Sequence, residues 1–323
     1  MLYKYVILLF KGGLIMNIFD LFSLQGTLFG IMLVGAILKK KGMIDENGKR
    51  CLTDICVNAI IPCNIFKSCL IEFNMGIFKS CATLLLAAFL IQFLCLFLNR
   101  HVFNGFNIQQ KKVLQYCTIV PMSGFLGNPI AEGLYDSIGI LYTSIFLLPM
   151  RIVMWSVGTT YFVADATVDR KKVIKNVLTH PCLVAVYLGL FFVVTQIQLP
   201  KVVTETVRYI GNCNTGISMF VVGTILADVK LTSIFNRDTL FFSVFRLFVL
   251  PAAALGIGLA LNLNPIATGI SVVMTGMPAG ATAALFAARY NSDAPFATRC
   301  VIMTTLVSMI TLPCWSYVVT NFI

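Results

Sequence analysis

The chain has 323 residues, of which 58% are hydrophobic and only 11% are charged, and its mean hydropathy is +0.89. A soluble globular domain carries about 25% charged residues, so this composition excludes an ordinary water-soluble protein and indicates an integral membrane protein. The formal net charge of +11 predicts no nucleic-acid partner, because cationic loops on one side of a membrane explain it and would attract anionic lipid instead.

Ten membrane-spanning helices are predicted. A helix needs about 20 apolar residues to cross about 30 Å of hydrocarbon, and runs of this size recur along the chain. The N-terminal segment 1–17 is too short to add a span, and the sequence leaves open whether translation begins at Met1 or Met16. The expected spans are 18–38, 50–69, 78–99, 113–133, 138–163, 178–198, 206–227, 239–261, 266–288 and 297–319.

The distribution of Lys and Arg predicts the orientation. The loops after the odd-numbered spans hold most of these residues, whereas the other loops hold Lys67, Lys79, Lys201 and Arg208. Because short cytoplasmic loops are enriched in Lys and Arg, we expect the odd-numbered loops in the cytoplasm and both termini outside. The protein is accordingly expected in the cytoplasmic membrane.

Two predicted spans are interrupted at corresponding places. Span 4 contains SGFLGNP (123–129), and span 9 contains TGMPAG (275–280). Pro lacks an amide donor, and unwound backbone in a membrane is tolerated where it lines a cavity. The first repeat would be 18–164, the cytoplasmic linker 165–177 and the second repeat 178–323. Five spans per half predict an inverted repeat, and paired broken spans indicate a secondary transporter with a binding site at the bilayer midplane.

Several residues at these breaks are suited to binding a carboxylate. Pro129 and Pro278 are expected to begin the second half of each broken helix, a position that Pro favours. The free amides and the positive end of the helix dipole would then face a substrate anion. Hydrogen bonds are expected from Ser123, Asn128, Thr275 and Thr282, although the same side chains could instead cap freed backbone groups.

Spans 2 and 7 carry short polar side chains near their middles. Asn64 follows a Pro in span 2, and Thr215 precedes a Gly in span 7. If these regions lie at the depth of the two breaks, the four together would enclose a cavity lined by backbone and small polar groups.

Two arginines fall within spans. Arg151 lies about midway along span 5, where an unpaired charge costs roughly 3 kcal/mol or more. Its planar guanidinium suits a carboxylate, so it is a candidate for coordinating the anion, with a structural ion pair or a bond to broken-helix carbonyls as the alternative. Arg246, closer to the cytoplasmic face, is a second candidate that could line the inward path.

Other chemistry has weak support in the sequence. Glu132 is the best coupling candidate for H⁺, and Na⁺ coupling is disfavoured because spans 4 and 9 offer no clustered carboxylates. The cysteines form no CxxC pair, so neither a metal site nor a cofactor is expected. The chain also lacks the HExxH, GxGD and GxSxG motifs of intramembrane and other hydrolases, and it is not expected to be an enzyme.

From about Ile18 onward, the chain resembles the auxin efflux carrier family in its bacterial branch of malate- and malonate-permease-like proteins. The motifs that carry this resemblance are GFLGNP (124–129), PMRIVMWSVG (149–158), MPA (277–279), AARY (287–290), TTL (304–306) and TLP (311–313).

The resemblance implies an all-α membrane fold of ten helices in two inverted five-helix repeats, in which helices 4 and 9 cross at their breaks. It implies small organic anions as substrates and elevator-like alternating access, with Asn128, Pro129 and Pro278 at the substrate crossover. The family often has Pro in span 7 where this chain has Gly216, which leaves the shape of that cavity wall open.

Two other functions stay open at this stage. One is a sodium-coupled bile-acid-type symporter of the same architecture, and the other is a membrane sensor that transports nothing. The glycine-rich spans could pack within one chain or between the two chains of a homodimer.

Overall fold

The computed structural model describes residues 18–70, 75–162, 175, 178, 179, 181–197, 199–227, 236–290 and 292–322. Helices dominate these residues, and the one isolated β-bridge among them joins Pro121 to Ala279 in antiparallel orientation. The predicted N-terminal segment 1–17 and nearly all of the predicted linker 165–177 lie outside the described residues.

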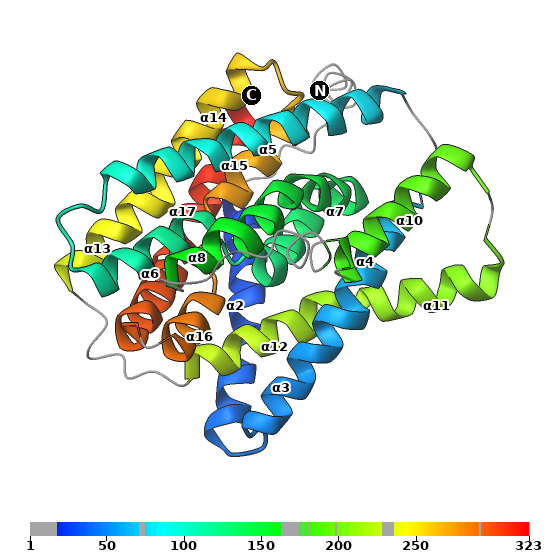
Figure 1. Cartoon of the computed structure of the whole chain (residues 1–323). Helices are drawn as coiled ribbons and strands as arrows, with labels where there is room; N and C mark the ends of the chain where they lie inside the picture. Colours follow the sequence, from blue (N-terminus) through cyan, green and yellow to red (C-terminus); the bar gives the residue numbers. More distant parts are fainter. Residues whose placement is uncertain are drawn as a thin grey trace.

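The first part of the chain folds into long helices that are joined or continued by π-helical turns (Figure 1). Asp45 and Asn107 begin two of them by accepting a hydrogen bond from a backbone N–H in the first turn, as N-cap residues do. The elements are α2 (Ile18–Lys40), α3 (Glu46–Ile55), η1 (Cys56–Ile60), α4 (Ile61–Ser68), α5 (Met75–His101), α6 (Ile108–Ile119), η2 (Ser123–Gly127), α7 (Asn128–Val153), η3 (Met154–Gly158) and α8 (Thr159–Phe162).

The second part repeats this style of construction. Asn236 and Asn264 are the N-caps of α13 and α15, and Asn264 has nearly the same backbone dihedral angles as Asn107 (φ −63° and ψ 157° against φ −63° and ψ 156°). The elements are α10 (Pro181–Thr195), α11 (Lys201–Asn212), α12 (Asn214–Ala227), α13 (Arg237–Val244), η5 (Phe245–Val249), α14 (Leu250–Ala260), α15 (Pro265–Thr275), α16 (Thr282–Arg289) and α17 (Ala294–Phe322).

The protein is a multi-pass membrane protein. Within the described residues, six helical stretches are long and apolar enough to cross a membrane, and α10 and α15 contribute shorter apolar helices. Helix is present in each of the ten ranges predicted from the sequence, while the count of ten spans stays a prediction. The six stretches are Phe22–Lys40, Met75–His101, Ser123–Val153, Lys201–Ala227, Arg237–Ala260 and Ala294–Asn321.

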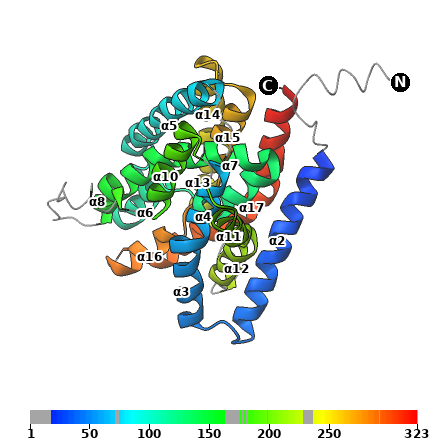
Figure 2. The same ribbon diagram turned by 90° about the vertical axis from the view of Figure 1, so that its right-hand side faces the viewer.

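The helices form two groups that pack more extensively within themselves than against each other (Figures 1 and 2). In the α2/α12 group, α2 packs along α12 while α4 packs against α10 and α11; α3 completes this group. In the α7/α15 group, which holds α5–α8 and α13–α17, α15 packs against α5, α7, α14 and α17. The two groups meet where α17 contacts α2 and where α7 contacts α4.

Close backbone contact joins α2 to α12 inside the first group. A Cβ atom at Gly223 would collide with the backbone oxygen of Met32. Because lipid provides no hydrophobic drive between helices, small residues that allow such close approach stabilise helix pairs in membranes. The α2–α12 pair is therefore well suited to act as a rigid frame.

Candidate functional site at a helix crossover

Two interrupted helices cross at the bridge between Pro121 and Ala279. The first runs along α6, loses its helical form at residues 120–122 and resumes at η2, which continues into α7. The second runs along α15, loses its helical form over residues 276–281 and resumes at α16. We call residues 120–122 and 276–281 the crossover.

Backbone hydrogen bonds hold the two segments of the crossover together. The N–H of Met122 donates to the carbonyl of Pro278 at 2.8 Å, and the N–H of Gly280 donates to the carbonyl of Val120 at 2.9 Å. Such pairing satisfies backbone groups that unwinding exposes within the membrane, where an unbonded group costs several kcal/mol. These hydrogen bonds therefore stabilise the crossover.

The position of the first break differs from the sequence prediction. Residues 123–127 are helical, so the break lies before Ser123, at Pro121 and its neighbours. Pro121 lacks an N–H and ends α6, after which Met122 bonds to the other segment instead of continuing the helix. Pro129 does lie at the start of α7, but a helical turn already precedes it.

The prediction that Pro278 begins the second half-helix is wrong. α16 begins at Thr282, and Pro278 lies in the non-helical segment before it, where its carbonyl accepts the bond from Met122. The antiparallel pairing with residues 120–122 accounts for this, because it holds residues 278–280 in a bridge conformation and the helix resumes only after them. Within this stretch the N–H of Ala279 donates to Thr304 Oγ1 at 3.1 Å and the N–H of Gly280 donates to the carbonyl of Val120.

The helical halves that start at the crossover lack side-chain caps. The side chains of Met122, before η2, and Ala281, before α16, accept no bond from the first turn, whereas the side chains of Asn107 and Asn264 cap the halves that lead into the crossover. Helix N-termini carry roughly +0.5 elementary charge and free N–H groups. Two uncapped N-termini at one place create a positive environment.

Three buried asparagines, on helices that pack together, have amide atoms without partners. Both amide atoms of Asn64 and of Asn128, and the Nδ2 of Asn214, are buried and unbonded. They lie on α4, at the start of α7 and at the start of α12, and α7 packs against both of the other helices. A buried amide without a hydrogen bond costs about 1–3 kcal/mol, so a ligand that bonded to these groups would recover this free energy.

Arg246 lies at the crossover, fully buried in η5. Its Nε donates to the carbonyl of Met277 at 3.0 Å and its Nη1 to that of Thr118 at 2.6 Å, while Nη2 has no partner. Arg246 therefore bonds to both broken helices at once.

A cavity of about 10 Å³ lies beside Arg246. Gln92 and Thr275 line it, and each has a buried oxygen without a partner. The remaining walls come mainly from apolar residues of α5, α7 and α15. Such a volume holds about one water molecule, which is too small for an organic anion in this conformation.

Arg151, the other candidate arginine, is 8% exposed near the end of α7. Its Nη1 is buried without a partner, and among the described residues no carboxylate forms an ion pair with it. No hydrogen bond within the described chain joins it to the crossover. The predicted role in binding the anion stays a prediction, and the broken-helix carbonyls expected as its alternative partners are bonded by Arg246 instead.

The remaining predicted residues divide into bonded and unbonded groups. Ser123 donates to the carbonyl of Met274 at 3.3 Å, and Thr282 accepts from the hydroxyl of Tyr116 at 3.0 Å. The hydroxyl of Thr275 is unbonded, and Thr215 is half-buried on α12. Ser123 thus bonds a backbone carbonyl near a break, as the alternative interpretation expected, whereas the partner of Thr282 is another side chain.

Glu132, the candidate coupling residue, forms an ion pair with Lys67. Lys67 Nζ lies 2.9 Å from Glu132 Oε1 and also donates to Asn212 Oδ1 at 3.0 Å. Lys67 belongs to α4 and Asn212 to α11, whereas Glu132 belongs to α7. This ion pair therefore connects the two helix groups.

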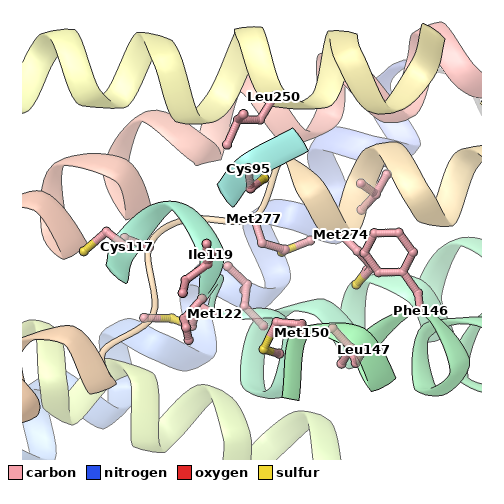
Figure 3. Close-up of a cluster of buried hydrophobic side chains, with 14 of the residues drawn as sticks. Cys95, Cys117, Ile119, Met122, Phe146, Leu147, Met150, Leu250, Met274 and Met277 are labelled. Atoms are coloured by element: carbon pink, nitrogen blue, oxygen red, sulfur yellow. The ribbon is translucent and has the colours of Figure 1, made fainter. Parts of the chain in front are cut away.

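Four methionines surround the crossover. Met122, Met150, Met274 and Met277 gather there from separate segments (Figure 3). Methionine is flexible and tolerates repacking, so these four side chains would repack if the two segments of the crossover shifted. Their meeting depends on the crossover, so no local pattern in the sequence marks it.

Sequence analysis also missed Pro121, Lys67, Gln92 and Asn214. Pro121 stands two residues before the predicted break and could have been noticed as a helix-ending residue. The other three gain their importance from residues far away in the chain, and no local pattern marks them.

Two broken helices that cross within a bundle of membrane-length helices define a membrane transport protein. Models of protein families agree, because the family described as "Membrane transport protein" matches residues 26–169 and 167–316. The chain belongs to this family, and the resemblance to auxin efflux carriers is confirmed.

The similar proteins include microbial and plant transporters. An "Uncharacterized transporter" of Methanothermobacter thermautotrophicus is 24% identical over 309 residues, covering 89% of this chain and 95% of that protein. The "Uncharacterized transporter YfdV" of Escherichia coli K12 is 22% identical over 298 residues, covering 89% and 94%. "Auxin efflux carrier component 7" of Arabidopsis thaliana is 25% identical over 140 residues, covering 43% of this chain and 23% of the plant protein.

Proposed function

We propose that this protein is a secondary transporter of small organic anions, with a mono- or dicarboxylate such as malate as substrate. The observations that support the proposal are the two helix N-termini without side-chain caps at the crossover and the unpaired buried amides of Asn64, Asn128 and Asn214 on helices that pack together. Backbone and amide N–H donors next to positive helix ends suit a carboxylate. Similarity to the plant auxin efflux carriers, named for an organic anion, supports the same substrate class.

The proposed architecture has ten spans in two inverted five-helix repeats. The matching N-caps Asn107 and Asn264 and the paired breaks support it, as does the fact that the two family matches meet within 165–177. With both termini outside and the Lys- and Arg-rich loops inside, the protein would lie in the cytoplasmic membrane.

Transport would follow from movement of the α7/α15 group against the α2/α12 group. The crossover belongs to the first and Asn64 and Asn214 to the second. A carboxylate held at the crossover would travel with the moving group and exchange its bonds with these amides on the way. This arrangement fits alternating access by movement of one helix bundle against another.

Coupling to H⁺ is proposed through Glu132, because its partner Lys67 lies on the other group. Protonation of Glu132 would remove the ion pair and ease relative movement. A sodium-coupled carrier is the alternative, since the free amide oxygens of Asn64 and Asn128 could also bind a cation.

Uptake of labelled malate into liposomes containing the purified protein tests the proposal. We expect uptake by the wild type, loss of uptake in Asn128→Ala and Arg151→Gln, and normal uptake in the control Asn58→Ala. Asn58 is an exposed asparagine of the same chain that donates only to the carbonyl of Asp54. Absence of malate uptake by well-folded wild-type protein would reject malate, and normal uptake by Arg151→Gln would remove Arg151 from the mechanism.

Gradients separate the coupling models. Dependence on a pH gradient that Glu132→Gln abolishes would support H⁺ coupling through this residue. Dependence on a sodium gradient would favour the alternative, and uptake that needs neither gradient indicates a uniporter or exchanger.

A further inference from the structure

A buried arginine without a carboxylate partner needs another source of negative charge. Arg246 is 1% exposed, and no ion pair with it occurs among the described residues. A charge inside a membrane protein is costly unless the protein compensates it. Two of its three nitrogens bond to backbone carbonyls, of Thr118 and Met277.

These carbonyls mark the negative ends of two helices. Thr118 is in the last turn of α6, whose final carbonyls have no partner within the helix, and Met277 follows Gly276, the C-cap of α15. Each helix C-terminus carries roughly −0.5 elementary charge. The two ends together therefore amount to about one negative charge, which the guanidinium offsets.

Four helix ends meet at the crossover, and Arg246 compensates only two of them. The ends that remain are the N-termini at η2 and α16, which are positive and carry no side-chain cap. Without Arg246 the four partial charges would nearly cancel. With it, the crossover has a net positive field that favours an anion.

We propose that Arg246 is the residue that determines the charge preference of the site, acting from behind the crossover and without touching the substrate. Direct contact is disfavoured because the cavity that Arg246 lines holds only about one water molecule. The inference rests on the proposed function, since it requires that the site bind an anion.

The test compares ligands of different charge on charge-changing variants. Arg246→Gln removes the charge but keeps a donor for one carbonyl, whereas Arg246→Lys keeps the charge. The dissociation constants of malate, a dianion at pH 7, and of its monomethyl ester, a monoanion, would be measured on purified protein in nanodiscs. Thermal unfolding and size-exclusion profiles of each variant establish that it is folded.

An electrostatic role predicts effects that scale with ligand charge. For Arg246→Gln we expect the monoester to bind on the order of tenfold more weakly and malate on the order of 100-fold more weakly. Arg246→Lys should keep the ratio of the two dissociation constants near that of the wild type. If Arg246 served folding alone, the factor by which the malate dissociation constant rises would not be the square of the factor for the monoester.

Three results would overturn the inference. The first is unchanged binding of both ligands in folded Arg246→Gln, and the second is equal weakening of the binding of both ligands. The third is loss of folded protein in the Lys variant as well as the Gln variant, which would mean that the geometry of the guanidinium, and not its charge, is required. Failure of the wild type to bind either anion would instead reject the proposed function, so the two failures are distinguishable.

Discussion

Arg246 and the buried asparagines of α4 and α12 differ in how far their polar groups are bonded. In η5, Arg246 uses its donors to tie Thr118 and Met277 together. On α4 and α12, the side chains of Asn64 and Asn214 are as deeply buried as that of Arg246, yet the Nδ2 amide group of each donates no hydrogen bond. Folding alone favours bonded polar groups. The difference teaches that Arg246 maintains the crossover, whereas the unbonded amides of Asn64 and Asn214 do less for folding, which is the basis of their proposed role in binding a ligand.

The largest effect on stability is expected from removing the hydrogen bonds of Arg246. Arg246→Met would leave two buried carbonyls without donors, and we expect it to lower the free energy of unfolding by about 2–4 kcal/mol. The control Arg208→Met removes an exposed arginine whose partners, Glu205 and the ring of Tyr209, are on the same helix, and its effect should stay below about 0.5 kcal/mol. Thermal and denaturant unfolding in detergent would measure both. Equal stability of the two variants would contradict a stabilising role for the hydrogen bonds of Arg246 to Thr118 and Met277.

The close approach of the crossing segments gives the next largest effect. A Cβ atom at Gly280 would lie 2.8 Å from the backbone oxygen of Val120, so Gly280→Ala must push the segments apart, at a cost of about 1–3 kcal/mol. At Gly216, in helix α12, an added Cβ meets no atom within 4 Å. Gly216→Ala should therefore be neutral or stabilising, by up to about 1 kcal/mol. A stable Gly280→Ala protein would argue against the paired crossover.

Substitution of the unbonded asparagines should raise stability while it abolishes function. Asn128→Leu replaces unpaired buried amide atoms with apolar ones of similar volume, and we expect a gain in stability of about 1 kcal/mol together with loss of malate uptake. Asn64→Leu should behave alike. Loss of stability in both variants would mean that these amides have structural partners after all, and unchanged uptake would remove them from the site.

The sequence predicted where the helices break but not how the polar groups at the breaks are bonded. Gly and Pro interrupt helices for local reasons, so 275–280 was located correctly and the first break was missed only by a few residues. Arg151 and Arg246 show the limit. Each is a lone arginine in an apolar span, and only the fold reveals that Arg246 holds both broken helices while Arg151 does not. Bonding depends on residues more than 100 positions away, such as Thr118, and no local pattern encodes it.

The smallest effect should come from the ion pair that connects the two helix groups. Lys67 and Glu132 are partly exposed, with side-chain exposures of 17% and 29%, and such pairs contribute about 0–1 kcal/mol. Lys67→Met should therefore change thermal stability little, and salt should reduce the difference further. If the pair restrains movement between the groups, the same variant should raise the rate of malate exchange while leaving its binding unchanged, because the buried asparagines are untouched. An exchange rate equal to that of the wild type would show that the pair does not restrain transport, and weaker malate binding would place Lys67 within the site.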